Sequence, residues 1–133
     1  MSDFSDVVFV WGETGPWVPT VRPGELTCWV GAWPVVLGCE MLHWDSAAGP
    51  SKEQAVRLRE HRVILVKLFG ASKHVTQARA ANPSAFIVAM PDPPLEYVLR
   101  DEPKAILDQM ARADLIAGRT QHGAAVYGAL FGK

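Results

Sequence analysis

The chain has 133 residues, of which 49% are hydrophobic and 20% are charged, and its formal net charge is -1. This length and apolar content allow one domain to bury a core, and they exclude a disordered chain. The near-zero charge gives no general attraction to nucleic acid or to an anionic membrane, so we expect neither as a partner.

The first 45 residues begin with a predicted strand and continue as irregular chain. Residues 7–11 form an apolar, β-branched run, and residues 12–16 then turn the chain. From there to Asp45 the sequence is rich in Pro and Gly, and all five tryptophans of the chain lie in this first third. We expect most of them in the core, and one or two on a cleft or a partner surface.

An amphipathic helix is predicted within residues 46–62. Ser51 is followed three residues later by Gln54, which is the spacing of a capping box at a helix start. The predicted inner face holds Ala55, Val56 and Leu58.

Three strand-then-helix units follow this helix. The predicted strands are apolar runs at residues 63–68, 85–90 and 114–117, and the helices after them end at residues 81, 113 and 131. Strands joined by helices of this length pair in parallel through right-handed crossovers. We therefore predict one α/β domain over residues 1–133, Rossmann-like and three-layered (α/β/α), with a mainly parallel sheet. The pattern stops where another strand would follow, which predicts an open sheet edge or a missing strand.

The two cysteines and the absence of targeting segments favour a cytoplasmic protein. Cys28 and Cys39 read as small core residues of a reducing compartment. Cys39, His43 and Asp45 are close in sequence, but without a paired Cys-x-x-Cys element they do not predict zinc, so no metal or other cofactor is expected. The sequence has no bilayer-spanning apolar stretch and no secretion signal at its amino terminus.

Polar residues follow the predicted strands at their carboxyl ends, where parallel sheets bind ligands. Ser72, Lys73 and His74 place a hydroxyl, a cation and an imidazole at a helix start, which predicts an anion site, although neither a P-loop nor a dinucleotide fingerprint is present. The plainer alternatives are turn or helix caps for Asp92, Ser72 and Thr120, and a solvated position for His74. The candidate catalytic residues are Asp92 and His74, and the candidate substrate- or phosphate-binding residues are Gly12, Glu13, Ser72, Lys73, Arg119 and Thr120.

The carboxyl-terminal part of the chain resembles a known family. Residues 113–120 read Ala-Asp-Leu-Ile-Ala-Gly-Arg-Thr and lead into a helix that ends at Gly132-Lys133, and Asn82-Pro83 and Pro91-Asp92-Pro93 flank the preceding apolar strand. Over residues 63–133 this is similar to the amino-terminal domain of two-domain glycosyltransferases of the GT-B type. The resemblance implies a nucleotide-sugar-dependent enzyme that acts on a carbohydrate or small-molecule acceptor. This chain would be its acceptor-side domain, inactive without a carboxyl-terminal nucleotide-sugar domain.

Departures from that family leave an alternative open. The glycine-rich turn expected after the first strand has only loose counterparts at residues 12–15 and 23–25, and the Trp-rich segment stands where a helix is expected. The alternative is a stand-alone Rossmann-like module that binds a ligand or a protein through the Trp-rich segment, without catalysis. A homodimer partner on the open sheet edge would favour this alternative.

Overall fold

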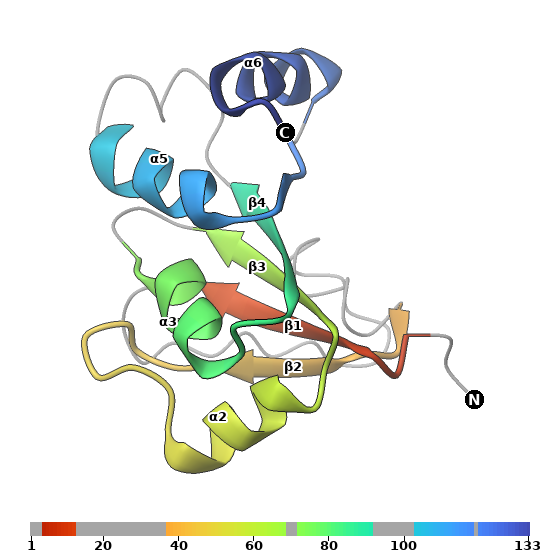
Figure 1. Ribbon diagram of the computed structural model, residues 1–133, viewed down its shortest axis with the longest axis vertical. Coiled ribbons are helices and arrows are strands. Elements are labelled where there is room, and N and C mark those ends of the chain that lie inside the picture. The colour runs from red at the N-terminus through yellow and green to blue at the C-terminus, as the bar shows by residue number, and fades with distance from the viewer. Residues whose placement is uncertain (1–3, 13–36, 69–71, 92–102, 119) are drawn as a thin grey trace, which may run out of the picture.

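The computed structural model describes residues 4–12, 37–68, 72–91, 103–118 and 120–133 (Figure 1). The elements in chain order are β1 (Val7–Gly12), β2 (Glu40–His43), α2 (Lys52–Arg59), β3 (Val63–Leu68), α3 (His74–Ala81), β4 (Phe86–Pro91), α5 (Pro103–Arg112), β5 (Leu115–Ile116) and α6 (Gln121–Phe131). Five strands form one all-parallel sheet in the order β2-β1-β3-β4-β5. The predicted mainly parallel, Rossmann-like α/β fold is confirmed.

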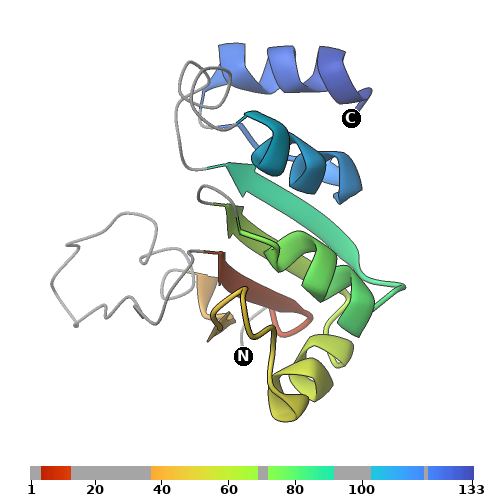
Figure 2. The same cartoon turned by 90° about the vertical axis from the view of Figure 1, so that its left-hand side faces the viewer.

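Helices α2, α3 and α5 lie on the same side of the strands (Figure 2). The steps from β2 to β5 all move in one direction across the sheet, and right-handed crossovers that advance in one direction place their helices on one face. The core on this face is built from alternate strand residues, such as Val10 of β1 and Val66 of β3, together with Leu58, Val75 and Met110 of the three helices.

The opposite face of the sheet carries a second buried cluster. Phe9 and Trp11 of β1 are buried there and pack against the half-buried side chains of Cys39, Met41, Leu65 and Met90. Cys39 is a free thiol, and burial raises its pKa. The alternation of side chains along β3 places Lys67 on this face, where it is 2% exposed and pairs in register with Trp11 on one side and Met90 on the other.

Most of the predicted helix ends are confirmed. Ser51 and Gln54 form the capping box of α2, and the Thr120 hydroxyl accepts a hydrogen bond from the amide of Gly123 at the start of α6. Gly132 ends α6 with φ at 67°, a left-handed conformation that glycine adopts without strain. The predicted capping role of Ser72 is wrong: α3 begins at His74, its N-cap position is Lys73, and no side-chain cap hydrogen bond is formed.

Two further features differ from the sequence prediction. The edge strand β2 lies in the stretch that the sequence presents as irregular, because its four residues are all half-buried and show neither an apolar run nor a two-residue alternation. Its register comes from pairing with β1. In α2 the inner position is Leu58, whereas Val56 is 43% exposed, so its predicted place on the inner face is wrong.

Candidate functional site

The carboxyl ends of β1, β2 and β3 lie next to one another. Trp11 pairs with His43 of β2, and Gly12 pairs with Leu68 of β3. The chain leaves β1 for β2 on one side and reaches β3 on the other side, so the strand order reverses at β1. In open α/β sheets, ligands bind outside the carboxyl ends of the strands at such a reversal.

His74 is the first residue of α3 and lies at this end of the sheet. Its side chain is 0% exposed, and its Nε2 lies 2.7 Å from the carbonyl oxygen of Trp44. A carbonyl oxygen can only accept, so Nε2 carries the proton and donates it, which leaves a lone pair on Nδ1. Among the described residues, none forms a hydrogen bond with Nδ1.

The surroundings of His74 favour its neutral form. Burial lowers the pKa of His74 most, and nearby His43 lowers it further. The hydrogen bond to the Trp44 carbonyl and the charge of Asp45 act in the opposite direction without cancelling the shift. The His43 ring stacks with the His74 ring at a centroid separation of 6.4 Å, and the Trp44 ring lies at 5.0 Å in a tilted arrangement. A neutral imidazole with a free lone pair can accept a hydrogen bond or a proton.

Ser72 precedes His74 by two residues and is also buried, at 2% exposed. Its Oγ has no hydrogen-bond partner within the described part of the chain. Ser72 and His74 therefore do not bond to each other, which excludes a nucleophilic Ser-His pair in this arrangement. Two unpaired polar atoms this deeply buried are unusual, because each such group costs about 1–3 kcal/mol, and a ligand that supplies partners would remove that cost.

The segment after β2 that carries the Trp44 carbonyl is held by two glutamines. Gln54 Nε2 of α2 donates to the His43 carbonyl at 2.7 Å. Gln77 of α3 accepts from Trp44 Nε1 at 2.8 Å and donates to the Ser46 carbonyl at 2.7 Å. The packing of α2 and α3 therefore fixes the position of the His74 partner.

Gly12 has a structural reason to be glycine. A Cβ at this position would lie 2.0 Å from the carbonyl oxygen of Lys67, so only glycine allows β1 and β3 to pair to their ends. This close approach involves the neighbouring strand, and it explains Gly12 without a bound phosphate.

The other predicted site residues do not join His74 within the described chain. Lys73 is exposed, in contrast to its two neighbours Ser72 and His74. Thr120 follows β5, which lies two strands from β3, or about 10 Å at the usual spacing, and its hydroxyl is used by the α6 cap. Glu13, Asp92 and Arg119 lie outside the described residues.

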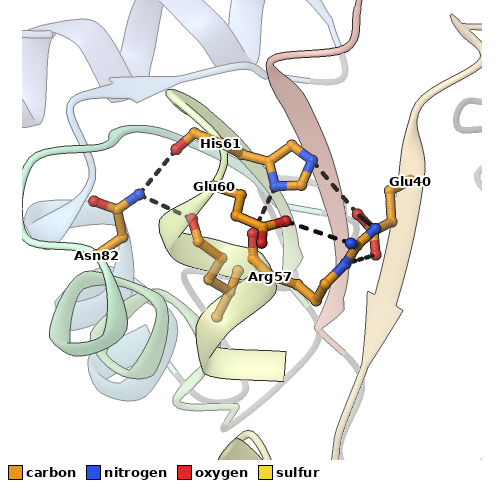
Figure 3. Close-up of polar contacts among 6 residues, drawn as sticks. Glu40, Arg57, Glu60, His61 and Asn82 are labelled. Atoms are coloured by element: carbon orange, nitrogen blue, oxygen red, sulfur yellow. Dashed lines mark hydrogen bonds and ion pairs between the residues drawn. The ribbon is translucent and has the colours of Figure 1, made fainter. Parts of the chain in front are cut away.

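A second polar cluster lies at the amino end of the sheet (Figure 3). Arg57 binds both oxygens of Glu40 at 2.8 Å and also contacts Glu60 at 3.3 Å. His61 Nδ1 donates to the Arg57 carbonyl, and its Nε2 lies 3.5 Å from Glu40. The buried side chain of Asn82 donates to the carbonyls of Leu58 and His61, at 2.9 Å each. These groups satisfy one another and tie α2 to the sheet, which is a structural role.

Sequence reasoning missed Trp44 as the partner of His74, and it missed Gln77. The signal for Gln77 was its spacing, because residues three apart on a helix lie on one face, and Gln77 follows His74 by three. It also missed Lys67, although a single cation inside an otherwise apolar strand is a recognisable signal of a buried polar contact.

Comparisons with protein-family models, with curated proteins and with solved structures give no match. Within the described ranges, no three His, Cys, Asp or Glu side chains come together in a way that could hold a metal ion. None of the described helices has the length and apolar character needed to cross a membrane.

Proposed function

We propose that this chain is the acceptor-side, amino-terminal domain of a GT-B-type glycosyltransferase, in which His74 receives the proton of an acceptor hydroxyl. The observation that carries the proposal is the buried, neutral His74 with an unpaired Nδ1 at the strand-order reversal. A lone pair at Nδ1 suits a hydroxyl donor and disfavours a phosphate oxygen, because both would be acceptors. The site therefore supports an acceptor alcohol better than the anion predicted from sequence.

In this proposal, the acceptor O–H donates to Nδ1 of His74 while its oxygen attacks the anomeric carbon of the sugar. The bond from that carbon to the nucleotide diphosphate breaks, and the diphosphate leaves with the electron pair. The Ser72 hydroxyl can donate to or accept from a second acceptor group. The nucleotide sugar is bound by a separate domain, in keeping with the family resemblance.

The test is an amide NMR titration of the full chain with a monosaccharide, a simple phenol and UDP-glucose. We expect at least one hydroxyl compound to shift the amide signals of Ser72, His74 and Trp44 together, and UDP-glucose to leave them unchanged. The variant His74→Gln should lose this binding. Tight binding of UDP-glucose to the chain, or hydroxyl-induced shifts confined to other residues, would contradict the acceptor-side proposal.

The zero exposure of His74 favours a second candidate, a Rossmann-like binding module without catalysis. An acceptor reaches Nδ1 only if the covering residues move, whereas a purely structural histidine needs no access. The two candidates differ in the same titration, because a module that binds elsewhere keeps its affinity in His74→Gln.

A further inference from the structure

Both polar atoms of the Gln77 side-chain amide are hydrogen-bonded, and their partners do not allow the amide to be flipped. Its Oε1 accepts from Trp44 Nε1, which is only a donor, and its Nε2 donates to the Ser46 carbonyl, which is only an acceptor. Rotating the amide by half a turn would place two donors together and two acceptors together. The geometry of these three residues therefore fixes the amide orientation.

Gln77 and His74 contact the same segment from neighbouring turns of α3. His74 donates to the main chain of Trp44, and Gln77 binds the indole of the same residue and the carbonyl two positions further on. Trp44 and Ser46 are themselves buried. With three hydrogen bonds from one helix, the Trp44 carbonyl can move away from His74 only if the contacts of Gln77 also break.

We infer that Gln77 is a positioning residue for His74: by holding Trp44 and Ser46, it keeps the Trp44 carbonyl on Nε2 and so keeps Nδ1 as the unprotonated nitrogen. The catalytic meaning of this arrangement rests on the proposed function, but the tautomer of His74 does not. A neutral histidine without such a partner exchanges its proton between Nδ1 and Nε2, and a proton on Nδ1 would remove the acceptor that the site offers.

Another glutamine of the chain provides a matched control. Gln109 of α5 also makes two hydrogen bonds to α3, accepting from the Thr76 amide at 3.1 Å and donating to the Thr76 hydroxyl at 2.7 Å. It is buried, and it contacts neither Trp44 nor His74 in these bonds. Gln109→Leu should cost stability of the same order as Gln77→Leu without acting on the imidazole.

The experiment is a long-range proton–nitrogen NMR correlation of the histidine side chains in the 15N-labelled full chain. The chain has four histidines, and the signals of His74 are identified as the set that disappears in His74→Gln. We expect a pyrrole-type Nε2 and a pyridine-type Nδ1 for His74 in the natural chain and in Gln109→Leu. In Gln77→Leu the tautomer ratio should shift by roughly two- to tenfold, the equivalent of one hydrogen bond. If Gln77→Leu does not fold, Gln77→Met, which keeps the unbranched shape, replaces it.

The inference is overturned if the Nε2–H signature of His74 is unchanged in the Gln77 variant. It is also overturned if Gln109→Leu shifts the tautomer ratio of His74 as much as the Gln77 variant does. Its failure is distinct from a failure of the proposed function. A tautomer that responds to Gln77 while no hydroxyl compound binds leaves the positioning role intact and removes the glycosyltransferase assignment. If a hydroxyl compound binds while the tautomer of His74 does not respond to Gln77, the positioning role is removed and the proposed function stands.

Discussion

The amide of Asn82 is the sharpest test of what holds the amino end of the sheet. Its Nδ2 donates to the carbonyls of Leu58 and His61, at 2.9 Å each (Figure 3). Its Oδ1 accepts from the Ser84 hydroxyl at 3.2 Å. Asn82→Ala removes both donors. Asn82→Asp keeps the shape but places a carboxylate oxygen opposite two carbonyl oxygens.

The two substitutions should differ in size. Asn82→Ala loses two hydrogen bonds from a buried group, which should lower the free energy of unfolding by about 2–3 kcal/mol. Asn82→Asp adds an unpaired buried charge, so the loss at pH 7 should be larger, about 3–5 kcal/mol. Because protonation restores a donor, the deficit of Asn82→Asp should shrink as the pH falls below the raised pKa that such a carboxyl would have.

Urea unfolding followed by circular dichroism measures this order directly. With a slope of roughly 1–3 kcal/mol per molar urea, a loss of about 2–3 kcal/mol in Asn82→Ala should lower the urea midpoint by roughly 0.7–3 M. The control is Gln121→Ala, which removes an exposed side-chain amide outside this cluster and should change stability by less than about 0.5 kcal/mol. If Asn82→Asp proves as stable as the natural chain, or more stable than Asn82→Ala at pH 7, the hydrogen-bond assignment is refuted.

Two further outcomes are expected. Gly12→Ala should destabilise the domain by about 3 kcal/mol in the same urea assay, because the new methyl group would overlap the Lys67 carbonyl across the β1–β3 pair. The comparison is Gly132→Ala, which has open space around its Cβ and should cost only the left-handed strain of about 1–2 kcal/mol at its φ of 67°. A loss in Gly12→Ala no larger than that of Gly132→Ala would show that β1 and β3 do not approach so closely. The lowered pKa of His74 means that the unfolded chain binds its proton first, so the natural chain should lose stability relative to His74→Gln as the pH falls below about 6.5. Midpoints measured from pH 7.5 to pH 5 test this, and a constant difference between the two proteins would contradict the burial of a neutral His74.

Several features of this protein follow from local sequence alone. Ser51 with Gln54, Thr120 and Gly132 act within one helical turn, so their roles as helix ends can be read directly from the chain. The apolar runs that became β3 and β4 are strands because they are buried on both faces, and their parallel pairing follows from the helices between them. The end of the sheet where a site could form is predictable for the same reason.

The composition of the site was decided by tertiary contacts. The sequence favours a cap for Ser72 and a solvated position for His74, but both side chains are buried. For His74 the reason is that the segment after β2 lies against the start of α3 and offers it the Trp44 carbonyl. The tautomer of His74 depends on Trp44, thirty positions earlier in the chain, and the edge strand β2 exists only through its pairing with β1. Local patterns determine elements whose hydrogen bonds close within a few residues, whereas the environment of a side chain depends on which distant segments pack against it.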